Sequence, residues 1–126
     1  MKFEVDKHDK YVLLKPLDTE LNSENAPKLK SELILINTEG INNIILDLSN
    51  IQEADESGVS ALLAANRLCK NSEGTFVLTC VHSEIQKLFG LFTTENYLNL
   101  VPTVSEAIDL VFMEEIERDL RREMNE

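Results

Sequence analysis

The sequence predicts an α/β domain with a mixed, mostly parallel sheet of about five strands and about four helices. Three observations support this fold class. Short apolar stretches typical of strands alternate with longer amphipathic stretches typical of helices. Two apolar stretches, Ile41–Leu48 and Thr75–Val81, are almost continuous, as in strands buried on both faces of a parallel sheet. The chain also begins with the pattern of a β-hairpin, which would add one antiparallel strand.

The first 40 residues predict this hairpin and a helix. Apolar and charged residues alternate over 3–6, residues 7–10 suit a tight turn, and Pro16 closes a second strand over 11–15. After a loop, the periodicity predicts a helix over about 24–37, capped by Asn22 or Ser23 and with Pro27 in its first turn. Gly40 is expected to be the left-handed residue that ends this helix.

The middle of the chain predicts a buried strand that leads into a tightly packed helix. Ile44–Leu48 is the expected central strand, and small and apolar residues dominate from Val59 to Cys69. The intervening residues Asp55–Gly58 therefore lie at or just before a helix N-terminus. Free backbone N–H groups and the helix dipole favour negative charge at that place.

The remaining elements follow the same alternation. A helix starting at His82 or Ser83 would bury Ile85, Leu88, Phe89 and Phe92. A short strand over 97–101 comes next, and Thr103 with Glu106 forms a capping box for the last helix.

We expect residues 1–126 to form a single domain, with a core over 1–112 and a charged helix end over 113–126. Phe112, Ile116, Leu120 and Met124 continue a thin apolar stripe into this end. Such a stripe fits a solvated, fraying helix end, and residues after Met113 are then dispensable for folding. The alternative is a seam for a partner helix, which leaves oligomerisation open.

Composition excludes several functions. The net charge of −11 argues against nucleic acid and against anionic membrane surfaces as partners. Acidity of this kind serves solubility, or else shapes a face for a basic partner. The charged N-terminus is unlike a signal peptide, and no apolar stretch reaches the ~18 residues that span a bilayer, so we expect a cytoplasmic protein. Cys69 and Cys80 are then expected to be reduced thiols rather than a disulfide or a metal pair.

We expect no enzymatic activity, no cofactor and no metal. Nucleotide-binding, zinc-protease and serine-hydrolase motifs are absent, and the two histidines, His8 and His82, do not form a pattern with Ser57. Asp55 and Glu56 could be paired carboxylates for acid–base work or a hard metal. Adjacent carboxylates at a helix start more commonly supply capping and favourable charge.

The ordered motifs resemble those of STAS domains, of which the bacterial anti-sigma factor antagonists are the simplest members. The sequence L-D-L-S of residues 46–49 and the D-E-S-G-V-S-A-L-L of 55–63 resemble the family's signature. The passages at 17–29, 74–80, 83–92, 97–102 and 103–108 resemble its other elements in order. In the family, Asp-Ser-Ser-Gly or Asp-Ser-Thr-Gly is usual, and the first hydroxyl after Asp is the usual phosphate acceptor. This chain has Glu56 there and keeps only the second hydroxyl, Ser57.

The resemblance implies a regulatory protein that binds a serine-kinase anti-sigma factor and so frees a sigma factor for transcription. Asp55, Glu56, Ser57 and Gly58 would form the partner-binding switch, with Gly58 letting a partner's backbone approach. Either Glu56 fixes the site in a phosphate-like condition, with Ser57 mainly capping the helix, or Ser57 is itself the acceptor. The first account is favoured, because a phosphate on Ser57 would meet two carboxylates. The alternatives are a scaffold or subunit of a larger assembly, such as a stressosome-like complex or a lipid transporter, and a domain that binds a small molecule such as a nucleotide.

Overall fold

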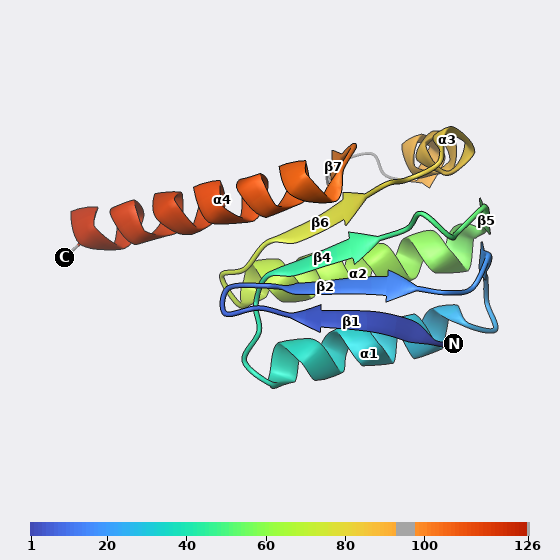
Figure 1. Ribbon diagram of the computed structural model, residues 1–126, viewed down its shortest axis with the longest axis horizontal. Helices are drawn as coiled ribbons and strands as arrows, with labels where there is room; N and C mark the ends of the chain where they lie inside the picture. The colour runs from blue at the N-terminus through green and yellow to red at the C-terminus, as the bar shows by residue number, and fades with distance from the viewer. Residues whose placement is uncertain (93–97, 126) are drawn as a thin grey trace.

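A computed structural model describes residues 1–92 and 98–125 of the chain (Figure 1). Its strands are β1 (Phe3–Lys7), β2 (Val12–Pro16), β3 (Glu20–Leu21), β4 (Ile44–Asp47), β5 (Glu53–Ala54), β6 (Phe76–Thr79) and β7 (Asn99–Val101). Its helices are α1 (Ala26–Thr38), α2 (Glu56–Asn71), α3 (Ser83–Phe92) and α4 (Val104–Met124).

The main sheet has five strands in the order β1-β2-β4-β6-β7. β1 pairs antiparallel with β2, and the other neighbours are parallel. The predicted fold class is therefore confirmed, including the antiparallel first strand and the central position of β4. Position 97, where the last strand was predicted to start, lies outside the described residues.

The central strands are buried on both faces because helices cover both sides of the sheet. Ile44 and Leu46 of β4 point into the larger core cluster, which also contains Leu29 and Leu33 of α1 and Leu62 of α2. Ile45 points the other way, into a smaller cluster with Val77, Ala107 and Val111. Helices α1 and α2 thus pack on one face and α4 on the other (Figure 1). This arrangement explains the unbroken apolar sequence of β4.

Two expectations about α1 differ from the structure. The helix begins at Ala26 with Asn25 as its N-cap residue, so neither Asn22 nor Ser23 caps it. Asn22 Oδ1 instead accepts hydrogen bonds from the backbone N–H groups of Glu24 and Asn25, at 3.0 and 3.3 Å, and so closes a turn before the helix. Pro27 does lie in the first turn, and Gly40 has the predicted positive φ, 95°.

In α3, Ile85 and Phe89 are buried as predicted and Leu88 packs at the edge of the core. The prediction for Phe92 was wrong, since its side chain is 42% exposed at the last residue of the helix. Thr103 caps α4, with its Oγ1 accepting a hydrogen bond from the Glu106 N–H at 3.2 Å.

Candidate functional site

The Asp55–Gly58 corner lies at the carboxyl end of the parallel strands, where α2 begins. Asp55 is the N-cap residue of α2, in an extended backbone conformation, and its Oδ1 accepts a hydrogen bond from the Gly58 N–H at 3.2 Å. Glu56 is the first helical residue and is exposed, and Ser57 follows it half-buried. Asp55 therefore performs the capping that was predicted for Ser57, and that prediction was wrong.

A second, two-stranded sheet fixes this corner. β3 pairs with β5 in parallel, with Glu20 opposite Glu53 and Leu21 opposite Ala54. The Asp55 N–H donates a hydrogen bond to the Leu21 carbonyl oxygen at 3.1 Å. The loop that precedes α1 is thereby joined to the residue that caps α2. Both segments were predicted to be irregular, and their pairing was not predicted.

Gly58 is buried against Leu21. A β-carbon built on Gly58 would lie 2.8 Å from Leu21 Cγ and 3.1 Å from its carbonyl oxygen. The close approach that glycine permits here is made by the protein's own chain. This internal packing is sufficient reason for a glycine at position 58, and the predicted contact of Gly58 with a partner stays a prediction.

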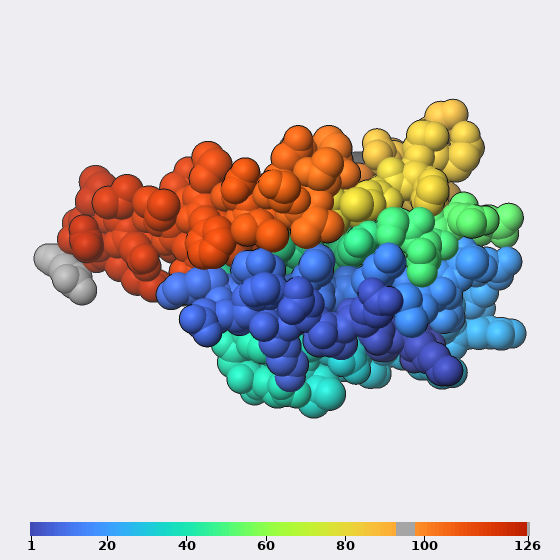
Figure 2. Space-filling view, viewed as in Figure 1, coloured from blue at the N-terminus to red at the C-terminus, as the bar shows by residue number. Residues whose placement is uncertain are grey.

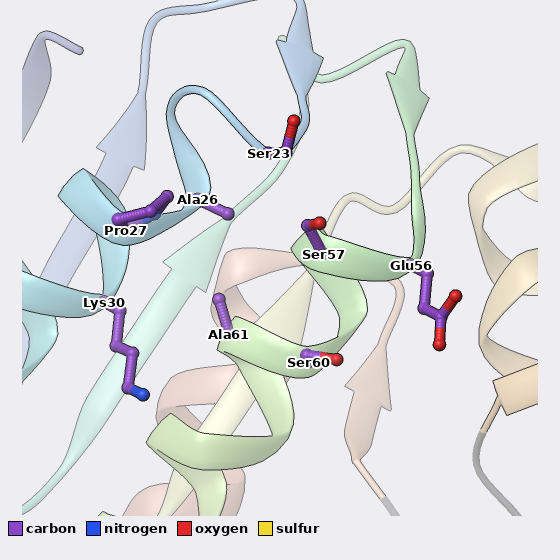
Figure 3. A pocket seen from close by; sticks show the side chains of 8 residues that line it. All are labelled: Ser23, Ala26, Pro27, Lys30, Glu56, Ser57, Ser60 and Ala61. Atoms are coloured by element: carbon purple, nitrogen blue, oxygen red, sulfur yellow. The ribbon is translucent and has the colours of Figure 1, made fainter.

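The two residues after Asp55 point in different directions. A groove of about 490 Å³ lies between the first turns of α1 and α2, and its walls include Ser23, Lys30, Ser57 and Ser60, with Glu56 at its edge. Figure 3 shows Ser57 facing the start of α1, whereas the Glu56 carboxylate extends away from Ser23 and Lys30. The corner thus presents an outward carboxylate beside a groove lined by hydroxyl groups.

In the part of the chain that the structure describes, both histidines have partners other than Ser57. His82 is bound to the Ser49 carbonyl oxygen, at 2.9 Å from its Nε2. His8 lies in the β1–β2 hairpin, where it contacts Asp6 and stacks on Tyr11. Within residues 1–92 and 98–125, no three His, Cys, Asp or Glu side chains are grouped so that they could hold a metal ion.

The two cysteines are free thiols, as predicted. Cys69 lies near the end of α2 and is buried in the core, and this burial raises the pKa of its thiol to about 12. Cys80 follows β6 and is partly exposed, with a positive φ of 58°. Neither contributes to the corner.

The part of α4 that was predicted to be a charged helix end, residues 113–126, carries a network of hydrogen bonds on the side that faces the sheet. The Arg118 guanidinium donates hydrogen bonds to Thr75 Oγ1 at 3.0 Å and to Asn43 Oδ1 at 3.1 Å. Asn43 Nδ2 donates to Glu115 Oε1 at 2.7 Å, and Thr75 Oγ1 donates to Glu114 Oε2 at 2.6 Å. Asn43 and Thr75 are almost fully buried. The boundary between core and tail at residue 112 stays a prediction, and these contacts argue for placing it later.

This network also affects the ionisation of Glu115. The hydrogen bond from Asn43 lowers the pKa of Glu115, and Arg118 lowers it further, against the opposing effect of partial burial. The carboxylate is therefore stabilised in its charged form.

The fold and the corner together describe an α/β module with a charged strand–helix junction. The model of the STAS domain family matches residues 2–107 of the chain. The chain belongs to the STAS domain family.

Solved structures agree with this assignment. A Thermotoga maritima protein, for which the role of anti-sigma factor antagonist is proposed, is 26% identical, with a TM-score of 0.77 over 86% of this chain and 93% of that one. The Bacillus cell-fate determinant SpoIIAA, in its phosphorylated form, is 21% identical, with a TM-score of 0.66 over 87% of this chain and 99% of that one. The murine anion transporter Slc26a9 is 13% identical, with a TM-score of 0.70 over 86% of this chain but 18% of the transporter. The protein is thus a STAS domain that resembles anti-sigma factor antagonists. No helix in the described part of the chain could cross a membrane.

Proposed function

We propose that this STAS domain is a cytoplasmic anti-sigma factor antagonist that binds a serine-kinase anti-sigma factor through its Asp55–Gly58 corner. Sequestering that factor would free a sigma factor for transcription. The observation that carries the proposal is the exposed Glu56 carboxylate in the first turn of α2, beside a groove between two helix starts.

Glu56 supplies a permanent negative charge where related domains have a hydroxyl that accepts phosphate. A phosphate adds about −1.5 to −2 charges and three acceptor oxygens, and Glu56 supplies one charge at the same helix start. Partner affinity is then set by a fixed charge rather than by a phosphorylation cycle. Ser57, half-buried and facing α1, is a poor acceptor in this account.

Incubation with the candidate kinase and labelled ATP tests the switch. We expect weak or no labelling of the wild type and strong labelling of Glu56→Ser, which restores the acceptor hydroxyl and removes one charge. Labelling of the wild type that disappears in Ser57→Ala would identify Ser57 as the acceptor and refute the fixed-charge account.

Binding to the unmodified partner tests the corner itself. Glu56→Gln removes the charge with little change in shape, and we expect it to change the dissociation constant for the partner. Glu106→Gln is the matched control, because Glu106 is an exposed carboxylate in the first turn of α4. Equal effects of the two substitutions would show that the corner is not the binding surface.

The second candidate function is a scaffold or subunit in a larger assembly. It is favoured by the exposed apolar side chains on the outer side of α4. A pull-down from the native host would distinguish the two, since recovery of a kinase-like anti-sigma factor supports the first and recovery of multimeric or transporter components supports the second.

A further inference from the structure

The distal part of α4 and the end of α2 enclose a cavity of about 360 Å³, which we call the basic hollow. Its walls include Lys70, Glu73, Arg118, Arg121, Arg122 and Asn125. Four cations and one carboxylate give these side chains a formal charge of +3, whereas the whole chain carries −11. Three of the four arginines in the sequence are gathered here. The hollow is therefore a local positive site on an acidic protein.

The basic hollow lies where α4 leaves the body of the protein. Positions 118, 121, 122 and 125 follow the three- and four-residue spacing of one helix face. Figure 2 shows the distal part of α4, in red, extending beyond the rest of the molecule. Arg118 fixes this face, because its guanidinium donates hydrogen bonds to Thr75 and Asn43, just before β6 and β4. Lys70, in the last turn of α2, contributes the opposite wall.

Arg121 and Arg122 have donor groups beyond those that their ion pairs use. A guanidinium carries five N–H donors. In the described part of the chain, Arg121 donates once, to Glu117 Oε2 at 3.4 Å. Arg122 donates to Asp119 Oδ1 at 3.4 Å and to Glu73 Oε2 at 2.7 Å. The pairs with Glu117 and Asp119 are exposed, and exposed pairs contribute little, so a ligand of higher charge can share or replace them.

Glu73 places a carboxylate of the protein itself in the hollow. Its Oε2 accepts a charge-assisted hydrogen bond from Arg122, although the two residues are 49 positions apart. The backbone of Glu73 has a positive φ of 58°, which residues other than glycine seldom adopt. The Arg122 guanidinium thus already binds one oxyanion, and Glu73 competes with any ligand that carries another.

The charge and volume of the site limit the size of its ligand. An extended polyanion would contact acidic residues outside the hollow, and the net charge of −11 opposes such binding. A volume of about 360 Å³ falls within the ~300–1,000 Å³ typical of small-molecule sites. Because the cations stand on two walls, a ligand with two linked anionic groups can contact both walls at once. Arginine forks match phosphate oxygens, and lysine binds phosphate as a point charge.

We propose that the basic hollow binds a small soluble compound that carries a diphosphate group. Lys70 contacts one phosphate, and Arg121 and Arg122 contact the other, with Asn125 as a further donor. The hollow lies at the end of α2, about 20 Å along the helix from Glu56 at its start (Figure 1). Diphosphate binding therefore stands or falls independently of the proposed function of the Asp55–Gly58 corner.

An NMR titration of the ¹⁵N-labelled full chain with inorganic pyrophosphate tests the site. We expect saturable shifts of the amide signals of Gly74, Arg121 and Asn125. Sodium chloride at the same ionic strength should not produce them. A wild type without saturable shifts, or with the same shifts in sodium chloride, would overturn the proposal.

Substitutions on the two walls test which side chains hold the ligand. Lys70→Gln and Arg121→Gln should each raise the dissociation constant for pyrophosphate about tenfold, because each removes a charge-assisted contact from an exposed position. Arg67→Gln is the matched control, since Arg67 is an exposed arginine of α2 outside the hollow. Equal effects of Arg121→Gln and Arg67→Gln would show that the anion binds elsewhere.

Glu73→Gln tests the competition within the hollow. It removes a negative charge with little change in shape, so the dissociation constant for pyrophosphate should fall about fivefold. An unchanged constant would mean that the anion does not reach Arg122, which contradicts the proposed site. A parallel titration with ADP distinguishes two sources of the same group. Equal affinity for ADP and pyrophosphate assigns the site to the free diphosphate, and tighter binding of ADP assigns it to an organic diphosphate.

Discussion

The side chain of Leu21 fills the space that a β-carbon on Gly58 would need, with Leu21 Cγ 2.8 Å from that position. Leu21 is 1% exposed and belongs to the main core cluster, so it has little room to move. The start of α2 is therefore packed directly against the short strand β3.

Gly58→Ala should destabilise the protein. The added methyl group displaces a buried side chain, which costs about 1–3 kcal/mol, against a gain of up to about 1 kcal/mol in helix propensity. Urea unfolding measures the net loss. Gly90→Ala is the matched control, because Gly90 is also helical and a β-carbon there meets no atom within 4 Å. The control should be slightly stabilised, and equal stabilisation of both variants would contradict the packing argument.

Asp55→Ala should cost about 0.5–2 kcal/mol of stability, because the substitution removes the N-cap of α2. Ser57→Ala should change stability much less, since Ser57 lies inside the first turn and does not cap it. Thermal or urea unfolding of both variants compares them. A larger loss for Ser57→Ala than for Asp55→Ala would mean that the cap is wrongly assigned.

Glu115 should make stability depend on pH in the acid range. Its folded-state pKa is lowered from 4.5, so its contribution is present above that value and is lost as the pH falls through the folded-state pKa. Glu115→Gln should therefore lower stability at pH 7 and reduce the fall in stability on acidification. Urea unfolding between pH 7 and about pH 3 measures this. Glu123→Gln, at an exposed position of the same helix, controls for the loss of one charge, and an identical pH profile for both variants would argue against the network.

Truncation after Met113 should leave a cooperative unfolding transition but lower its stability by about 1–3 kcal/mol. The buried residues of α4, Ala107 and Val111, remain, whereas the hydrogen bonds of Glu114, Glu115 and Arg118 to the body are lost. Truncation after Arg122 keeps these bonds and serves as the control. Loss of the transition in the shorter chain would place residues beyond Met113 in the folding core.

Much of the fold could be predicted because single segments carry their own signals. The unbroken apolar run at Ile44–Leu46 requires burial on both faces, and this places β4 in the middle of a parallel sheet. The helix start after Asp55 was also evident, since small and apolar residues follow a group of polar ones. Both signals lie within a few consecutive residues, so they can be recognised without knowing which other segments they contact.

Features that depend on distant partners could not be predicted. The β3–β5 pair has two residues in each strand and depends on backbone hydrogen bonds, which leave almost no side-chain pattern. Asn43 and Glu115 are 72 positions apart, and neither residue type indicates the other. The capping of α2 by Asp55 rather than Ser57 was a choice among adjacent polar residues that only the backbone geometry decides.

The pairing of β3 with β5 also ties together the two walls of the groove beside Glu56. The segment that precedes α1 is joined to the N-cap of α2 by the hydrogen bond from the Asp55 N–H to the Leu21 carbonyl oxygen. A displacement of α2 therefore carries this segment with it, and the groove keeps its width. The surface beside Glu56 is preorganised, which reduces the conformational entropy lost when a partner binds.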